Sequence, residues 1–363
     1  MRIAILGTRG IPARYGGFET FAEELSTRLA QRGHEVTVYC RQSHTEESWR
    51  GVHLRCLPAV RHKYLETLHH TFLSTLDLLR HRHDVALFCN AANALFTPLP
   101  RLAGMPVALN VDGIERRRKK WNFAGRTWYL ISEALAALCP DEIVTDAQSI
   151  HDYYRARYGR DSWFIPYGAP VGKVEPGPAL ERLGLEPQRY FLYVSRFEPE
   201  NNALMVRRAF ERVATGLRLV LVGDAPYAQD YICAVKDTRD TRVLIPGAIY
   251  GADYHELHSH SFAYIQATEV GGTHPALIEA MGRGALALYL TTAENEEVAG
   301  GVGLSFHDEA SLVARLREVL QMSDAERNEF RDAAAQRVRE RYSWDAVTIE
   351  YERLFNSLLH SAA

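Results

Sequence analysis

The sequence of 363 residues predicts an α/β protein made of two consecutive Rossmann-like, doubly wound domains. Short β-branched apolar runs alternate with helix-length segments along the chain, which is the pattern of a parallel sheet with crossover helices. A stretch rich in glycine and proline, residues 167–188, interrupts the alternation, which then restarts. Because such sheets bind ligands at the carboxyl ends of their strands, we expect the two domains to face each other across a cleft.

The first domain, expected over residues 1–170, opens with an apolar strand, Arg2–Leu6, followed by Gly7 and Gly10. Residues 17–32 then place apolar side chains at helical spacing, so we expect a helix there with one buried stripe. Further strands of this domain are predicted at residues 35–40, 85–89, 107–111 and 142–145.

The second domain is expected over residues 171–342. Ser343 is a good N-cap for a final amphipathic helix over residues 343–363. This helix either packs on the second domain or crosses back to the first, and we adopt the second placement. The strands of the second domain are predicted at residues 190–194, 218–222, 243–245, 262–265 and 285–290.

Composition and charge exclude several classes of protein. A formal net charge of −3 argues against a general binder of polyanions, so we expect no nucleic-acid partner. The five cysteines are widely spaced and odd in number, which argues for a reducing compartment and against a disulfide framework. We find no signal peptide and no apolar run long enough to span a membrane, and therefore expect a cytoplasmic protein.

The first candidate site is a glycine-rich loop between a strand and a helix. Gly7 and Gly10 follow the strand, and Gly16 and Gly17 stand at the helix start. Free backbone N–H groups at a helix start favour an anion, and glycines allow a ligand to approach closely. The dinucleotide pattern G-x-G-x-x-G is absent, which disfavours a dehydrogenase. The alternative is a tight turn that needs glycine for its backbone alone.

The second domain carries a second candidate site. Arg196 follows a strand, and its planar guanidinium suits a diphosphate. Gly271, Gly272 and Thr273 present backbone N–H groups at the start of another helix. Glu269 and Glu279 flank that cradle as acceptors for sugar hydroxyls, so the set predicts a nucleotide-sugar pocket. The alternatives are a surface ion pair for Arg196, a capping role for Glu269 and a solvated helix position for Glu279.

Acidic and basic side chains follow a strand of the first domain. Asp112 and Glu115 stand on the expected cleft side, and five cations and a tryptophan come next. Such a charge run is either a solvated face or a surface that contacts anionic lipid headgroups or a pyrophosphate-bearing acceptor. The residues of this expected acceptor or membrane contact are Glu115, Arg116, Arg117, Arg118, Lys119, Lys120 and Trp121.

The chain lacks the usual metal-binding patterns. It has no D-x-D and no H-E-x-x-H, and His258 and His260 would diverge on a helix. We therefore predict neither a structural nor a catalytic metal, and no cofactor.

Four stretches resemble glycosyltransferase family 4, whose members are retaining enzymes of the GT-B fold. Within that family the chain is most similar to bacterial rhamnosyltransferases of polysaccharide assembly. The stretches are ILGTRGIPARYGGFET at residues 6–20, VDGIERRRKKW at 111–121, RFEPENN at 196–202 and EVGGTHPALIEAM at 269–281.

The resemblance implies a role for each candidate residue in donor binding or catalysis. It makes Arg196, Glu269 and Asp112 the catalytic set, with Arg196 neutralising the leaving diphosphate and Asp112 standing where the family usually has a histidine. Contacts to the donor are implied for Gly16, Gly17, Asn201, Gly247, Tyr250, Gly271, Gly272, Thr273 and Glu279, with Glu279 on the ribose and the segment 246–250 on the base.

The chain departs from the family pattern at two further points. Asn201 occupies the position of a family lysine, so one positive charge on the diphosphate is missing. Nine residues separate Glu269 from Glu279, whereas the family usually has seven, and this weakens the assignment of Glu269.

The resemblance also implies the reaction, which is retaining transfer of L-rhamnose from dTDP-L-rhamnose to a saccharide or a polyprenyl-diphosphate-linked saccharide. Peripheral contact with an anionic membrane would accompany a lipid-linked acceptor. Two other functions remain open. A nucleotide-sugar epimerase of the same fold would turn over the donor without an acceptor, and a non-catalytic nucleotide-sugar-binding protein would release no nucleoside diphosphate.

Overall fold

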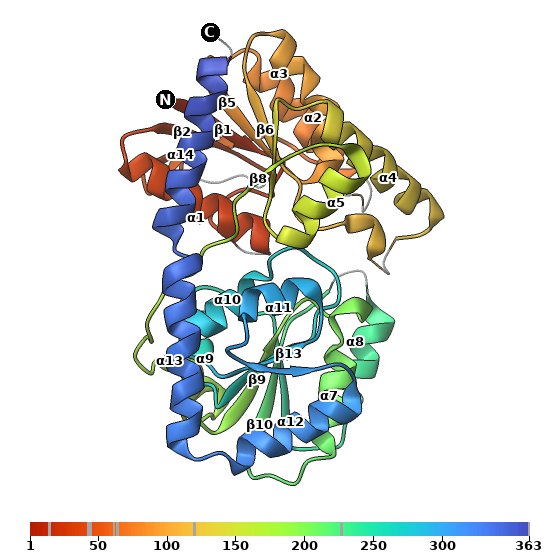
Figure 1. Ribbon diagram of the computed structural model, residues 1–363, viewed down its shortest axis with the longest axis vertical. Helices are drawn as coiled ribbons and strands as arrows, with labels where there is room; N and C mark the ends of the chain where they lie inside the picture. The colour runs from red at the N-terminus through yellow and green to blue at the C-terminus, as the bar shows by residue number, and fades with distance from the viewer. Residues whose placement is uncertain are drawn as a thin grey trace. The chain divides into compact units, whose positions relative to one another are not determined.

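The computed structural model describes residues 1–13, 16–41, 46–60, 62, 65–118, 121–225 and 228–361. The chain forms two compact units, each built around its own sheet (Figure 1). The first unit spans residues 1–117, 121–167 and the chain from Trp344 onward, and the second contains Arg118 and residues 168–343. We expected the boundary between the two domains at residue 170. No helix of the described chain is long and apolar enough to cross a membrane.

The described part of the first unit contains an eight-stranded sheet in the order β3-β4-β2-β1-β5-β6-β7-β8. Neighbouring strands are parallel except β3 and β4. Every residue of β5 is buried, as expected for a central parallel strand that helices cover on both faces. The elements are β1 (Arg2–Leu6), α1 (Gly17–Gln31), β2 (Glu35–Cys40), β3 (Ser48–Trp49), β4 (Val52–Cys56), α2 (Glu66–Leu78), β5 (Val85–Cys89), the 3-10 helix η1 (Ala91–Phe96), α3 (Pro98–Leu102), β6 (Val107–Asn110), the 3-10 helix η2 (Glu115–Arg117), α4 (Phe123–Leu138), β7 (Glu142–Thr145), α5 (Gln148–Tyr158), β8 (Trp163–Phe164) and α14 (Trp344–Ser361).

The second unit contains, within its described residues, a six-stranded parallel sheet in the order β11-β10-β9-β12-β13-β14. Phe191, Phe210 and Leu312 belong to the core that β9, α7 and α12 share. The elements are α6 (Pro178–Leu183), β9 (Tyr190–Val194), the 3-10 helix η3 (Pro199–Asn201), α7 (Ala203–Glu211), β10 (Arg218–Val222), α8 (Gln229–Lys236), β11 (Val243–Gly247), α9 (Gly251–His260), β12 (Ala263–Gln266), α10 (Pro275–Gly282), β13 (Ala287–Leu290), α11 (Ala293–Ala299), β14 (Leu304–Phe306), α12 (Glu309–Gln321) and α13 (Asp324–Arg341).

These two sheets confirm the predicted fold class, α/β with two doubly wound domains. Each predicted strand is present, with ends that differ by at most two residues. The sequence analysis missed β3, β4, β8 and β14. In β4 the exposed side chains of His53 and Arg55 interrupt the apolar run, and the other three strands have only two or three residues each.

The final helix, α14, packs in the first unit although it follows the second in the sequence (Figure 1). Tyr351 and Phe355 are fully buried, and the Tyr351 ring lies 5.4 Å from that of Phe21 in α1. The Nδ2 of Asn110 donates a hydrogen bond to the Tyr351 hydroxyl at 2.9 Å. Helix α14 therefore supplies both core packing and a polar contact at the end of β6.

Replacing Phe355 by alanine should destabilise the first unit, because the change removes a fully buried ring and leaves a cavity. We expect the free energy of unfolding of this unit to fall by about 3–5 kcal/mol. All five tryptophans, at positions 49, 121, 128, 163 and 344, belong to the first unit, so tryptophan fluorescence during urea unfolding reports on it alone. The exposed position Ser357, two residues along the same helix, provides the control Ser357→Ala. A change below 1 kcal/mol for Phe355→Ala would contradict the role given to α14.

Candidate functional site

The glycines that follow β1 meet a steric requirement of the turn. A Cβ at Gly7, where φ is 95°, would lie 2.4 Å from the carbonyl oxygen of Cys89. A Cβ at Gly10, where φ is 101°, would lie 2.5 Å from the Cys40 Sγ. The backbone of this loop therefore needs glycine at both positions without any ligand. This outcome supports the tight-turn alternative for Gly7 and Gly10.

Gly16 and Gly17 stand at the start of α1. Gly16 has a φ of −168°, an extended conformation open to any residue, and among the described residues a Cβ there would meet only the Glu19 Oε2, at 3.4 Å. The fold itself does not demand glycine at this position, so close approach of a ligand stays a prediction. The buried Glu19 accepts a hydrogen bond from the Arg9 N–H at 2.9 Å, which ties α1 to the loop after β1. Burial raises the pKa of Glu19.

Asp112 lies just beyond β6, in a left-handed backbone conformation with φ of 53°. Its N–H donates to the Oδ1 of Asn110 at 3.1 Å. The Asn110 amide is fixed in turn by the hydroxyl of Tyr351. The sequence analysis selected Asp112 but missed Asn110, the residue that holds its backbone in place.

The basic run after Asp112 is not the uniform exposed face that the sequence suggested. Arg116 donates from Nε to the buried Glu133 at 3.1 Å and from its NH2 group to the Tyr153 hydroxyl at 3.0 Å. Arg118 is buried, whereas Arg117 is exposed. Helix α4 supplies Glu133 and helix α5 supplies Tyr153, so the partners were not visible in the local sequence.

The rest of the expected acceptor or membrane contact is also partly enclosed. The Trp121 indole N–H lies 3.4 Å from the Glu115 Oε2, and its ring packs 5.0 Å from Tyr129. Lys119 and Lys120 lie outside the described residues. Among the described cations of the run, Arg117 is exposed, Arg116 is partly exposed and Arg118 is buried.

In the second unit, Arg196 follows β9 and is partly exposed. Its NH2 group lies 3.9 Å from the Glu198 Oε2, so a long ion pair of the kind considered from sequence is present. The Asn201 Nδ2 donates to the Arg196 carbonyl oxygen at 2.6 Å, and Asn201 is only 2% exposed. At the position of the family lysine, this chain therefore has a buried amide that shapes the Arg196 loop. A contact between Asn201 and the donor stays a prediction.

A neighbouring asparagine connects the Arg196 loop to the Glu269 loop. The Nδ2 of Asn202 donates to the Glu269 Oε1 at 3.0 Å and to the Ala267 carbonyl oxygen at 2.9 Å. In the reverse direction, the Glu269 N–H donates to the Glu200 carbonyl oxygen at 2.9 Å. Two predicted site segments, from the ends of β9 and β12, thus form one bonded unit. Asn202 was missed, and its φ of 61° is the kind that asparagine tolerates.

The Gly271–Thr273 segment leads into α10 through His274. A Cβ at Gly271 would lie 2.5 Å from the His274 Nε2, so the buried imidazole leaves room only for glycine. The His274 Nδ1 lies 2.6 Å from the Asn295 Oδ1. Asn295 is fully buried, and its Nδ2 donates to the carbonyl oxygens of Thr268 and Leu290. The amide of Asn295, also missed in the sequence, therefore holds the loop before α10 against the ends of β12 and β13.

Glu279 is buried in α10, at 6% exposure, which excludes the solvated alternative. The Tyr254 hydroxyl of α9 donates to its Oε2. Gly247, with φ of 90°, ends β11, and Tyr250 is exposed. The structure thus holds Glu279 firmly, while contacts of Gly247 and Tyr250 with a base stay a prediction.

A buried histidine lies beneath this part of the site. The ring of His258 packs 4.4 Å from Tyr254 and 5.1 Å from Tyr264, and neither ring nitrogen has a hydrogen-bond partner within the described residues. Burial lowers the pKa of His258 well below its ordinary value. This imidazole is therefore neutral near pH 7.

Potential metal ligands do not cluster in the structure. Among the described residues, no group of three or more histidines, cysteines, aspartates and glutamates is arranged to hold a metal ion.

Comparison with known proteins assigns both halves of the chain. Residues 15–171 match the family described as Glycosyltransferase Family 4, and residues 199–353 match the family described as Glycosyl transferase-like. Both halves therefore match models of glycosyltransferase domains. The first match includes Gly16, Gly17 and Asp112, and the second includes Asn202, Glu269 and the cradle before α10. Among proteins with curated descriptions, none matches this sequence.

Solved structures share the fold of the two glycosyltransferase domains over nearly the whole chain. Sucrose-phosphate synthase from Thermosynechococcus elongatus has 17% identity and a TM-score of 0.81, and covers 99% of each chain. HepE from Anabaena, in complex with UDP-glucose, has 16% identity and a TM-score of 0.81, and covers 98% of this chain and all of its own. A UDP-forming trehalose-phosphate synthase from Burkholderia xenovorans, in complex with glucose-6-phosphate, has 13% identity and a TM-score of 0.75, with 98% and 100% coverage.

The pH dependence of stability should reveal the buried His258. Below the ordinary histidine pKa of 6.5 the unfolded chain gains a proton that the folded site resists, so stability is lost as the pH falls. His258→Phe should remove this cost, so the variant should gain up to about 2 kcal/mol relative to the wild type between pH 6.5 and pH 5. Urea unfolding followed by circular dichroism at several pH values measures the difference.

The exposed His53 provides the control for this prediction. His53→Gln removes one histidine at an exposed position and so controls for the substitution itself. Parallel profiles for the wild type and His258→Phe would show that His258 does not carry the effect.

Proposed function

We propose that the chain is a retaining glycosyltransferase that moves L-rhamnose from dTDP-L-rhamnose to a saccharide or lipid-linked saccharide acceptor in the assembly of a bacterial surface polysaccharide. The observation that carries the proposal is the Asn202–Glu269 hydrogen bond, which joins the Arg196 loop to the loop that leads into α10. The choice of rhamnose rests on the resemblance of the four sequence stretches.

The geometry of the second unit supports binding of a nucleotide-diphosphate donor. Arg196 offers a partly exposed guanidinium, and the N–H groups before α10 add the positive end of a helix dipole. Tyr254 fixes the carboxylate of Glu279, which we assign to the ribose hydroxyls. The similar structures include HepE from Anabaena in complex with UDP, with UDP and glucose, and with UDP-glucose.

The chemistry proposed for the site is mainly electrostatic. As the bond between sugar and diphosphate breaks, negative charge develops on the leaving oxygen, and Arg196 with the oriented amides stabilises it. The acceptor hydroxyl attacks on the face that the diphosphate leaves, which retains the anomeric configuration. We assign the acceptor to the first unit and give Asp112, whose N–H donates to the Asn110 Oδ1, the role of orienting the hydroxyl or accepting its proton.

One observation favours a second function, a nucleotide-sugar-binding protein without transferase activity. The side chain of Asn201 donates to the Arg196 carbonyl oxygen and carries no charge, so it cannot replace the family lysine on the diphosphate. Such a protein would bind the donor but release no nucleoside diphosphate. An epimerase, in contrast, would convert the donor with no acceptor present.

The function is tested first with a panel of nucleotide sugars and then with a variant of Arg196. A donor at 100 times its Kd should stabilise the protein by about 2.7 kcal/mol, which ranks the candidates in a thermal unfolding assay. With the best donor and a bacterial membrane extract as acceptor, Arg196→Ala should lower kcat at least about 100-fold, because one charge-stabilising donor is lost. Release of nucleoside diphosphate measures kcat.

The exposed Arg208 of α7 supplies the matched control Arg208→Ala, which should leave turnover unchanged. An unchanged kcat in Arg196→Ala would remove Arg196 from the mechanism. Donor binding without any release of diphosphate would favour the binding protein, and conversion of the donor without acceptor would favour the epimerase.

The same proposal includes peripheral contact with an anionic membrane, and the apolar surface of the first unit supports it. Within the described chain, every strongly exposed large apolar side chain except Tyr250 lies in the first unit. Most of them lie on α2, η1, α3 and α4, which pack against one another. Leu102 and Phe123 are 87% exposed and Leu138 is 77% exposed. Side chains of this kind insert among lipid headgroups, and the neighbouring Arg117 and Arg126 can add attraction to anionic lipid.

Flotation with liposomes tests this contact. The wild type should float with vesicles of phosphatidylglycerol and less with vesicles of phosphatidylcholine. The triple variant Leu102→Gln, Phe123→Gln and Leu138→Gln should lose most of the bound fraction, since three exposed apolar side chains are removed. Tyr250→Gln, the matched change in the second unit, should bind like the wild type. Undiminished flotation of the triple variant would refute the contact.

A further inference from the structure

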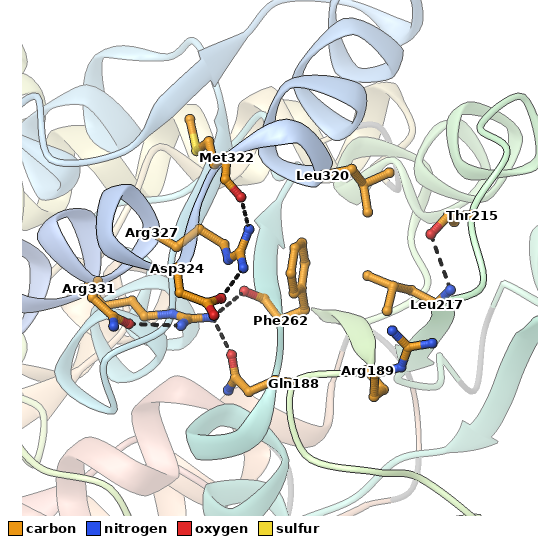
Figure 2. Close-up of a pocket in the computed structure, with 11 residues that line it drawn as sticks. Gln188, Arg189, Thr215, Leu217, Phe262, Leu320, Met322, Asp324, Arg327 and Arg331 are labelled. Atoms are coloured by element: carbon orange, nitrogen blue, oxygen red, sulfur yellow. Dashed lines mark hydrogen bonds and ion pairs between the residues drawn. The ribbon is translucent and has the colours of Figure 1, made fainter.

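A surface pocket of about 650 Å³ opens in the second unit (Figure 2). It lies at the amino ends of the strands, whereas Arg196 follows the carboxyl end of β9. Its walls come from the residues that precede β9, β10 and β12, and from the junction of α12 with α13. Arg196 and Gly271 follow the strands, whereas Arg189 and Phe262 precede them. All strands of this sheet are parallel, so residues that precede them and residues that follow them lie at opposite ends of the strands. The pocket therefore lies away from the donor site. Its volume lies in the range of small-molecule sites.

The pocket combines an apolar middle with cationic sides. Leu217 and Phe262 are buried, and Leu320 is partly buried beside them. Figure 2 shows the guanidinium groups of Arg327 and Arg331 on one side of the Phe262 ring and that of Arg189 on the other. A ligand that suits this lining carries negative charge and an apolar ring or chain.

The cations of the pocket outnumber its carboxylates. Asp324 is the single acidic side chain among the lining residues, against three arginines. The Arg327 guanidinium already engages Asp324, donates to the Met322 carbonyl oxygen and lies 4.9 Å over the Phe262 ring. Asp324 also acts electrostatically on Arg331, but one carboxylate cannot balance three arginines, so net positive charge remains in the pocket.

Arg331 carries the most deeply buried positive charge of the pocket. It is only 8% exposed, and its hydrogen bonds go to neutral oxygens, those of Phe262 at 2.9 Å, of Asn328 at 3.1 Å and of the Gln188 side chain. Its Nε has no hydrogen-bond partner within the described residues. Arg207, equally buried in the same unit, has Glu211 at 3.0 Å.

A buried cation without an opposite charge in contact carries a desolvation cost that an anion can offset. Burial accordingly lowers the pKa of Arg331. The structural contacts to Phe262 and Gln188 explain how α13 is held to the sheet, but they supply no negative charge. A ligand anion would supply it.

We propose that this pocket binds a small organic anion, whose phosphate or carboxylate faces the arginines and whose apolar ring or chain lies on Leu217, Phe262 and Leu320. The ligand would connect α13, through Arg331, to the amino ends of β9 and β12. This inference is independent of the proposed transferase reaction, because the pocket shares no residue with the donor site.

Isothermal titration of the full chain with 1-naphthyl phosphate tests the proposal. This probe has one aromatic body and one phosphate, and we expect saturable binding to one site. Arg189→Ala should weaken binding about tenfold, as expected for loss of one charge-assisted contact. Arg189 is exposed, so this variant should fold normally. Arg218→Ala, at an exposed arginine on the same edge that does not line the pocket, should bind like the wild type.

Further probes separate the parts of the ligand. Inorganic phosphate and 1-naphthol should each bind at least tenfold more weakly than the ester, because each lacks one half of the contacts. 1-Naphthoate distinguishes a carboxylate ligand from a phosphate ligand, and binding of either one supports the proposal. Arg331→Lys, with its fold checked by circular dichroism, should also weaken binding, since lysine cannot reproduce the forked contacts.

Several results would overturn the proposal. These are absence of saturable binding by both naphthyl anions, equal affinity in Arg189→Ala and the wild type, and equal affinity for 1-naphthol and the ester. Loss of binding in Arg196→Ala would assign the probe to the donor site instead. If Arg331→Lys fails to fold, the comparison of Arg189→Ala with Arg218→Ala still decides the question. A failure of transferase activity would leave all of these measurements unaffected.

Discussion

The arrangement of the second unit depends on one side-chain amide, that of Asn202. Its Nδ2 reaches the Glu269 carboxylate and the Ala267 carbonyl oxygen, while the Glu269 N–H returns a bond to the Arg196 loop. Parallel strands bring their loops to one edge but do not fix the loops to each other. Here the Asn202 Nδ2 and the Glu269 N–H fix them, because each donates a hydrogen bond to the other loop. The side-chain amide of Asn295 likewise fixes the loop before α10 to the ends of β12 and β13. The positions of Arg196, Glu269 and Gly271 follow from these amides.

The sequence predicted the central strands because they are uninterrupted apolar runs, as in Val85–Cys89, where every residue is buried. It missed β4 because His53 and Arg55 face solvent and break that run. Glu279 was found because it follows a glycine cradle at a helix start. The sequence analysis did not select Asn202 and Asn295. Their side chains bind carbonyl oxygens of distant residues, and such contacts produce no recognisable motif in the neighbouring sequence.

The basic run after Asp112 illustrates the same limit. Five consecutive cations look uniform in a sequence, but each side chain takes its environment from distant residues. Arg116 donates hydrogen bonds to Glu133 and Tyr153. Arg118 is buried, while Arg117 is exposed. The apolar exposure on α2, α3 and α4 could not be foreseen either, because helical spacing predicts an apolar stripe but not whether another element covers it.

The position of α14 in the first unit affects how the protein folds during translation. Phe21 and Asn110 find their partner Tyr351 only after more than two hundred intervening residues have been synthesised. During translation, the core of the first unit therefore stays partly uncovered until α14 is synthesised. The second unit needs no later segment, because all of its strands and helices precede α14. A chaperone that holds nascent chains would meet the early half of this protein, and shortening the polypeptide at its far end would harm the half that was made first.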